Sequence, residues 1–195
     1  MIKLRKYIVI IGLFIFFSIP IFFGVFTEYL YITSSNWFVI LTLFLGLFCF
    51  LFMSKIIERF CYNKSNVVPL RDHDVINAFI NKENTIILCI LLLIIISVEE
   101  LIFRYYTNGI MIFFLKMDSI VSVLLSSLMF SLFHIHIWFR YRNSVIFLIN
   151  FSYPFLLGIF NGYILLTLGI VPCIFIHYVV ALNAHYGIYK RFFKI

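Results

Sequence analysis

Long apolar blocks alternate with short polar stretches along this chain. A helix that crosses a hydrocarbon core of roughly 30 Å needs about 20 apolar residues at 1.5 Å each. Six blocks come close to this length, and turn-forming pairs such as Asn161-Gly162 separate them. The pattern predicts transmembrane helices over approximately residues 7–26, 37–54, 85–106, 119–139, 144–160 and 163–186.

The composition agrees with a chain immersed in lipid. Of the 195 residues, 64% are hydrophobic and 12% are charged, and the mean hydropathy is +1.11. A soluble fold needs polar residues for its surface, whereas a protein in hydrocarbon can be apolar on both its inner and outer faces. We therefore expect an all-α, polytopic membrane protein. It would form a single membrane domain over residues 1–195, with a core at 85–186 and a cytosolic loop at 55–84.

The basic residues test this segmentation, because Lys and Arg accumulate on the cytoplasmic side of membrane proteins. With the N-terminus inside, all but two of the 15 basic residues fall in cytosolic segments, the exceptions being Arg104 and Lys116. Both termini are then expected to be cytosolic, and the first apolar block is expected to be a retained span rather than a cleaved signal peptide. The net charge of +7 needs no nucleic-acid partner.

Two glutamates lie inside the third apolar block. The uncharged stretch at 85–98 would span only about 21 Å as a helix, which is too short for the membrane. The helix must therefore continue past Glu99 and Glu100, and both carboxyls come to lie within the membrane thickness. Ionisable residues at that depth are costly unless they are paired or hydrated, and they are functional candidates by default.

Spacing gives one of these glutamates a partner. Glu100 and Arg104 are four residues apart, so they share a helix face and can form an ion pair. Glu99 points about 100° away from Glu100 and has no obvious local cation. A carboxylate without a full counter-ion in a low-dielectric site suits a general base or acid. The alternative is that all three side chains only hold helices together.

Histidines in later blocks are natural partners for the glutamates. His134 and His177 lie deep in the fourth and sixth blocks, whereas His136 and His185 lie near the interface, where structural roles are expected. Glu99 and His134 differ in depth by about 13 Å on straight helices, and helix tilt would close part of that difference. A glutamate pair and two histidines on three spans form a convergent set.

These residues form motifs that resemble a known family. Glu99-Glu100-Leu-Ile-Phe-Arg104 matches an EExxxR motif, Phe130-Ser-Leu-Phe-His134 matches FxxxH, and His177 follows on a later span. The order and spacing over roughly residues 85–185 resemble the CPBP family, which comprises CAAX proteases and bacteriocin-processing enzymes, including the Abi proteins.

The resemblance implies an intramembrane endopeptidase of the glutamic type that needs no cofactor. Glu99 would be the general base, and His134 would hold and polarise the attacking water. His177 would donate a hydrogen bond to the oxyanion, while Glu100 and Arg104 would brace the site. Amide hydrolysis needs both an activated water and a donor aimed at the developing negative charge.

One position departs from the family pattern. The last motif is commonly HxxxN, but Ala181 stands here in place of the asparagine. Loss of one oxyanion donor typically costs about 10² to 10³ in rate. Asn183 lies about 120° away from the face of His177, whereas Asn150 or Asn161 on the fifth span could project into the site instead.

Three other interpretations stay open. Glu99, His134 and His177 could ligate zinc as a two-histidine, one-carboxylate site, although no HExxH motif is present. Alternatively, the protein could be a non-catalytic membrane scaffold or binding protein, as Ala181 and the basic loop suggest. A small transporter with a Glu and His proton relay is weaker, because the sequence has no internal symmetry.

The expected partners are the lipid bilayer and a membrane-anchored peptide or protein substrate. The cleaved segment could be a leader, a C-terminal sorting tag or a CAAX-like end, and the sequence does not choose among them. Abundant Phe and Ile indicate an AT-rich genome, which favours a multi-pass protein of a bacterial plasma membrane.

Overall fold

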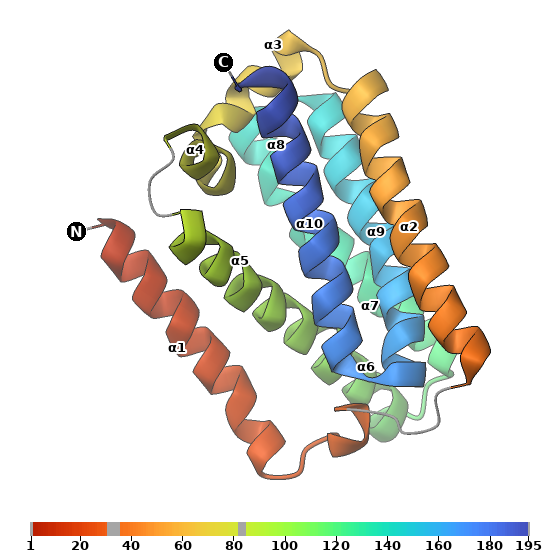
Figure 1. Ribbon diagram of the computed structural model, residues 1–195. Helices are drawn as coiled ribbons and strands as arrows, with labels where there is room; N and C mark the ends of the chain where they lie inside the picture. Colours follow the sequence, from red (N-terminus) through yellow and green to blue (C-terminus); the bar gives the residue numbers. More distant parts are fainter. Residues whose placement is uncertain (1, 31–35, 82–84, 195) are drawn as a thin grey trace.

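The computed structural model describes residues 2–30, 36–81 and 85–194, and most of them are helical (Figure 1). The polar linker at 31–35 and Lys82 of the basic loop lie outside these ranges. No strand occurs among the described residues. The elements are α1 (Ile2–Phe22), η1 (Thr27–Tyr29), α2 (Trp37–Phe60), α3 (Lys64–Val67), η2 (Val68–Asp72), α4 (Asp74–Asn81), α5 (Thr85–Glu100), η3 (Leu101–Tyr106), α6 (Thr107–Gly109), η4 (Ile110–Phe114), α7 (Ser119–Phe133), α8 (His136–Tyr141), α9 (Ser144–Leu168) and α10 (Ile170–Phe192).

Helices occupy all six apolar blocks. In α1 the apolar part, Tyr7–Phe22, is shorter than in the others. The prediction of an all-α, polytopic membrane protein is therefore confirmed. Five stretches are long and apolar enough to cross a membrane, namely Trp37–Phe60, Thr85–Phe114, Ser119–Tyr141, Ser144–Leu168 and Ile170–Phe192.

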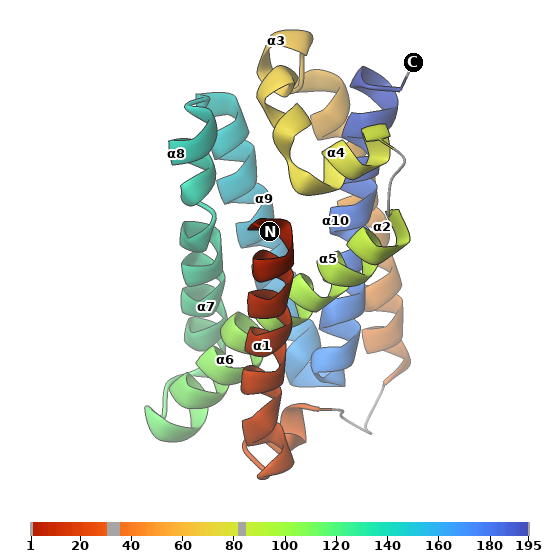
Figure 2. The same ribbon diagram turned by 90° about the vertical axis from the view of Figure 1, so that its left-hand side faces the viewer.

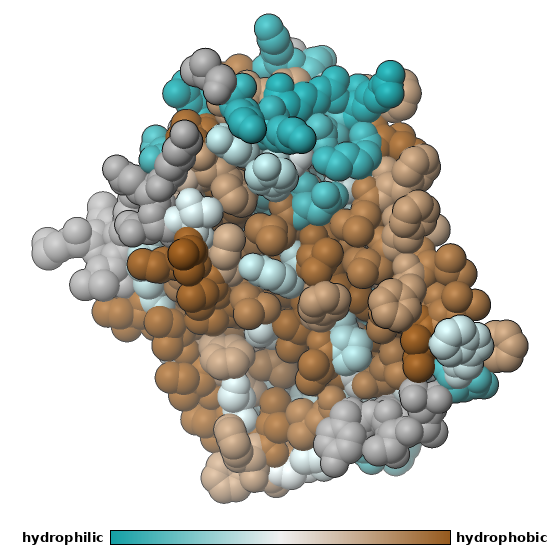
Figure 3. Space-filling view, in the orientation of Figure 1, coloured by the Kyte–Doolittle hydropathy of each residue, from teal (hydrophilic) through white to brown (hydrophobic). Residues whose placement is uncertain are grey.

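The polar residues collect at one end of the bundle. A broad band of apolar surface covers the middle of the molecule, and hydrophilic residues gather at the end that carries α3 and the C-terminus (Figure 3). We call this the basic end, because it carries Lys55, Arg59, Lys64, Arg71, Arg140 and Lys190.

The predicted turn at Asn161-Gly162 is wrong, because α9 continues through both residues. Asn161 is buried, and its amide donates to the Cys173 carbonyl at 3.1 Å. A Cβ on Gly162 would lie 2.5 Å from a methyl carbon of Val123, so glycine allows α7 to approach α9 closely. The chain turns instead at Gly169, whose φ of 89° favours glycine.

The third apolar block is also longer than predicted. Its helical stretch runs over Thr85–Phe114 rather than 85–106, and it includes a π-helical segment, η3, directly after the two glutamates. Segments of π-helix are rare and frequently lie at functional sites.

The remaining helices enclose the end of α5. Helix α10 packs against α2, α5 and α9, and α7 packs along α9. Helix α1 stands apart from this bundle and contacts α5 (Figures 1 and 2). The hydroxyl of Tyr105 in η3 donates to the Val25 carbonyl at 2.8 Å, which ties the chain after α1 to the π-helical segment.

Candidate active site

The motif glutamates end α5, and Glu100 is fully buried. Its Oε2 lies 3.4 Å from Nε of Arg104, so the ion pair indicated by their spacing is present. The Arg104 guanidinium is also fully buried, and its carbon lies 3.9 Å from the centroid of the Phe130 ring. A cation over an aromatic face is stabilised electrostatically. Arg104 is therefore held between a carboxylate and an aromatic ring.

His177 from α10 lies between the two glutamates. Its Nδ1 is 2.8 Å from Oε1 of Glu100, and its Nε2 is 3.9 Å from Oε2 of Glu99. An ionised carboxylate only accepts hydrogen bonds, so Nδ1 donates to Glu100 and fixes the orientation of the ring. The other nitrogen then faces Glu99. The sequence shows no obvious local cation for Glu99 on its own helix. The fold instead brings His177 of α10 to Glu99 as a partner.

Glu99 differs from Glu100 in its surroundings. Its side chain is 18% exposed, and it lines a cavity of about 360 Å³ within the bundle. His134 and His177 line the same cavity. The three residues to which the family resemblance gives water activation and oxyanion binding therefore line one cavity.

His134 presents one ring nitrogen to this cavity. Its Nδ1 lies 2.9 Å from the Phe130 carbonyl, which can only accept, so Nδ1 carries the proton. Nε2 of the neutral ring is then left as an acceptor. No hydrogen bond or ion pair joins His134 directly to Glu99 among the described contacts. The two side chains line the same cavity.

An aromatic cluster brings the ends of α5 and α7 together. Phe103 in η3 packs on Phe130, with ring centroids 5.4 Å apart. Phe130 in turn contacts the imidazoles of His134 and His177 edge to face, at 4.8 and 5.5 Å. The oblique path of α5 (Figure 1) agrees with the helix tilt that was expected to bring Glu99 and His134 closer in depth.

The three asparagines that could replace the missing oxyanion donor lie in different places relative to the cavity. Asn150 lines the cavity with Glu99, as does Ala181. Asn161 does not line it, and lies instead in the buried contact between α9 and α10. Asn183 donates to the Ser54 hydroxyl at 3.2 Å and so faces α2. Of these three residues, only Asn150 brings a side-chain amide to the cavity.

All five histidines of the chain line this one cavity. Sequence reasoning gave His136 a structural role, because it lies near the membrane interface. The helix is broken between α7 and α8, at residues 134–135, so His134 and His136 turn toward the same space with ring centroids 6.2 Å apart. No glycine or proline marks this break in the sequence.

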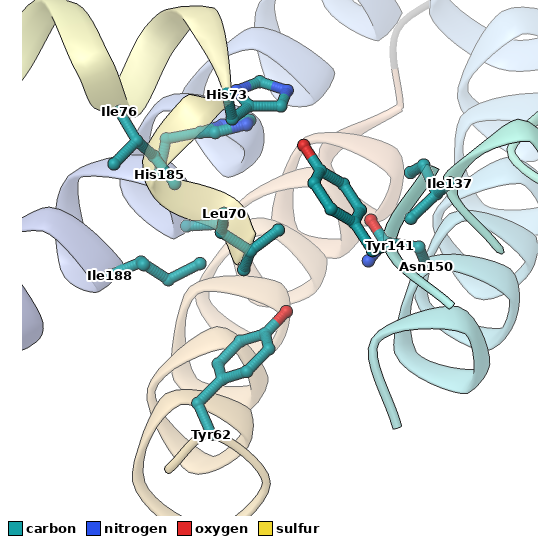
Figure 4. Close-up of a pocket in the computed structure, with 10 residues that line it drawn as sticks. Tyr62, Leu70, His73, Ile76, Ile137, Tyr141, Asn150, His185 and Ile188 are labelled. Carbon is teal, nitrogen blue, oxygen red and sulfur yellow. The ribbon is translucent and has the colours of Figure 1, made fainter. Parts of the chain in front are cut away.

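The other two histidines lie at the basic end of the cavity. The rings of His73 and His185 are stacked, with centroids 4.7 Å apart. Both also line a smaller adjoining cavity of about 100 Å³, where Asn150 and Tyr141 lie on the opposite side of the view (Figure 4).

The zinc alternative finds no support in the geometry. Within the ranges 2–30, 36–81 and 85–194, no group of three or more His, Cys, Asp or Glu side chains is arranged to hold a metal ion. Glu99, His134 and His177 line a common cavity but do not converge on one point.

The fold and the site define a helical integral membrane protein with acidic and imidazole side chains gathered around a cavity in the helix bundle. A sequence model of the Rce1-like type II CAAX prenyl endopeptidases matches residues 81–182, which is more than half of the chain. The chain belongs to this endopeptidase family, and the CPBP resemblance is confirmed. No curated protein and no solved structure matches the chain significantly.

Proposed function

We propose that this protein is an intramembrane endopeptidase that hydrolyses a peptide bond with a water activated by Glu99 and His134. The observation that carries the proposal is the cavity that Glu99, His134 and His177 share in a member of an endopeptidase family. A general base, a second polar group for the water and an oxyanion donor are the parts that amide hydrolysis requires.

The reaction begins with a water in the cavity. Glu99 takes one proton as the water oxygen attacks the carbonyl carbon, and Nε2 of His134 accepts a hydrogen bond from the other. When the His177 ring carries both protons, Nδ1 donates to Glu100 and Nε2 is a donor for the oxyanion. Glu99 then passes its proton to the leaving nitrogen as the C–N bond breaks. The products are a carboxylic acid and an amine.

Glu100 and Arg104 act as positioning residues in this mechanism. Both are fully buried, and neither lines the cavity. Their ion pair and the hydrogen bond from His177 support the orientation of that imidazole. Pre-organisation of this kind matters because displacing a catalytic group by about 1 Å can cost about 10² in rate.

The proposed substrate is a membrane-associated peptide or protein, cut at a leader, a C-terminal sorting tag or a CAAX-like end. We further propose a single membrane domain in a bacterial plasma membrane, with both termini in the cytosol. The Lys and Arg residues that define the basic end support that orientation, and hydrophilic residues gather at that end (Figure 3). A non-catalytic membrane scaffold is the competing function, because Ala181 brings no amide to the cavity.

Comparison of cells that express the wild type or Glu99→Gln separates these functions. Mass spectrometry of membrane fractions, with new peptide termini labelled, would detect cleavage of any membrane protein in the sample. We expect at least one terminus that forms only with the wild type. Glu28→Gln is the matched control, because Glu28 is exposed and lies outside the bundle core.

The outcome decides between protease and scaffold. A terminus present with the wild type and Glu28→Gln but absent with Glu99→Gln supports the protease. Identical termini with all three proteins, together with full cellular function of Glu99→Gln, would refute it.

A further inference from the structure

The C-terminal ends of α2 and α10 meet at the basic end of the molecule (Figure 1). Arg191 of α10 reaches across to α2, where its guanidinium donates to the carbonyls of Glu58 and Arg59, the second at 3.3 Å. The last carbonyls of a helix lack partners within the helix and carry partial negative charge, so a cation is stabilised there. This contact brings the Arg191 guanidinium to the end of α2, which itself carries Lys55 and Arg59.

The one carboxylate in α2 and α10, that of Glu58, is turned inward. Its Oε2 lies 3.0 Å from Nζ of Lys55, and its side chain is 16% exposed, against 52% for Lys55. Gly187 of α10 allows this arrangement, because a Cβ there would lie 3.0 Å from Nζ of Lys55 and would clash with Oε2 of Glu58. The acid is therefore packed against the backbone of α10, while Lys55, Arg59 and Arg191 stay exposed.

We call Lys55, Glu58, Arg59 and Arg191 the α2–α10 patch. Three cations and one carboxylate give it a formal charge of +2. Guanidinium groups match the oxygens of a phosphate with paired donors. Arg191 has five N–H donors, so it can hold the end of α2 and still donate to a bound anion.

An exposed apolar strip of α2 leads up to this patch. Phe48, Phe52 and Ile56 follow one another at intervals of four residues, so they share a helix face, and all three are exposed. The rings of Phe48 and Phe52 are stacked, with centroids 6.4 Å apart. Arg59 comes three residues after Ile56 and continues this face. From Phe48 to Arg59 the helix rises about 16 Å, which is close to half of the roughly 30 Å hydrocarbon core of a bilayer.

We propose that the α2–α10 patch and this strip together bind an anionic phospholipid. Its phosphate would lie on Arg59 and Arg191, and its acyl chains would run along the strip over the depth of one leaflet. The headgroup of phosphatidylcholine is neutral overall, because it carries an ammonium as well as a phosphate. The positive patch should therefore prefer a lipid with a net negative headgroup such as phosphatidylglycerol. This inference does not depend on the proposed function.

Binding of single lipid molecules tests the proposal. The full-length protein in detergent micelles is titrated with phosphatidylglycerol or with phosphatidylcholine of the same acyl chains. Native mass spectrometry then gives the Kd of the first lipid bound. A Lys or Arg near a membrane surface contributes about fivefold to the binding of anionic lipid. We therefore expect phosphatidylglycerol to bind at least about tenfold more tightly than phosphatidylcholine.

Substitutions assign the preference to the patch. Arg59→Gln removes an exposed cation and leaves the carbonyl that accepts from Arg191 in place. Arg59→Gln and Arg191→Gln should each weaken phosphatidylglycerol binding about fivefold and leave phosphatidylcholine binding unchanged. Arg142→Gln is the matched control, because it removes the same charge next to α8, on the other side of the bundle from α2 (Figure 2). It should leave both Kd values unchanged.

The contact between Arg191 and α2 also supports the packing of the two helices, so the fold of each variant is checked. Thermal unfolding followed by circular dichroism shows whether a variant is folded. If the loss of Arg191 unfolds the protein, Arg59→Gln decides the test.

Inorganic phosphate separates a lipid site from a site for a free anion. Isothermal titration calorimetry of the micellar protein with inorganic phosphate should show no saturable binding. Saturable phosphate binding that Arg59→Gln removes would assign the patch to a free anion and overturn the lipid surface. Equal Kd values for the two lipids would overturn it as well, as would a preference that Arg142→Gln lowers as much as Arg59→Gln does.

Discussion

The imidazole of His177 donates from Nδ1 to the Glu100 carboxylate at 2.8 Å, and this bond decides which nitrogen faces Glu99. Two adjacent glutamates thereby come to differ in their surroundings. Glu100 is fully buried, and its two oxygens contact His177 and Arg104, whereas Glu99 is partly open to a cavity.

Replacing Glu100 with glutamine should destabilise the protein by roughly 3–5 kcal/mol, because the fully buried Arg104 would lose its charged partner. Denaturant unfolding in detergent micelles measures the change. The double variant Glu100→Gln/Arg104→Met should recover part of the loss, since no unpaired charge is left buried. A double variant as unstable as the single one would contradict this explanation.

Replacing Gly158 with alanine should disturb the site by crowding Arg104. The new Cβ would lie 2.9 Å from Cβ of Ser127 and 3.1 Å from Nη2 of Arg104, so the guanidinium or α7 must shift. We expect a loss of about 1–3 kcal/mol in stability and a lower cleavage rate. Gly12→Ala is the control, because nothing lies within 4 Å of its added Cβ. Equal effects at both glycines would contradict the steric explanation.

Asn150 is expected to serve as a second oxyanion donor in place of the amide missing at Ala181. Its Nδ2 donates to the Ile146 carbonyl at 2.8 Å, and the amide has a second proton. Asn150→Ala should lower kcat by about 10²-fold, and Ala181→Asn in the same chain should restore part of it. The rate is measured with the substrate identified by terminal labelling.

The control for this pair is Asn183→Ala, because Asn183 faces α2 rather than the cavity. It should leave kcat unchanged. If Asn150→Ala also leaves kcat unchanged, Asn150 is not an oxyanion donor.

Removal of metal ions should leave the activity unchanged. Among the described residues, no group of three or more His, Cys, Asp or Glu side chains is arranged to hold a metal ion, and the proposed mechanism gives no step to one. The test is peptide cleavage after dialysis against a chelator, compared with a sample to which zinc is returned. Activity that falls on dialysis and returns with zinc would favour the metal alternative.

The helices could be predicted from the sequence because their apolar blocks have the length that a bilayer demands. The turn between the last two helices could not be predicted. Asn161-Gly162 has the composition of a turn, but the asparagine is buried against α10 and the glycine admits Val123. Small and polar residues inside a membrane helix serve close packing as readily as they mark a turn.

The candidate site was predictable where its residues share a helix face, as Glu100 and Arg104 do. The position of His177 between both glutamates depends on how α10 packs against α5, which local spacing does not encode. The same holds for His136, which reaches the cavity through an unmarked break between α7 and α8. Deep polar residues could be recognised in the sequence, but the contacts that they make across helices could not.

The Glu100 and Arg104 pair also bears on how the protein enters the bilayer during synthesis. Both charges lie on one continuous helical stretch, so they can neutralise each other as soon as that stretch has been made. His177 emerges from the ribosome 77 residues after Glu100. The helical stretch Thr85–Phe114 therefore carries its own counter-ion through insertion, and the imidazole joins the two glutamates only when α10 docks.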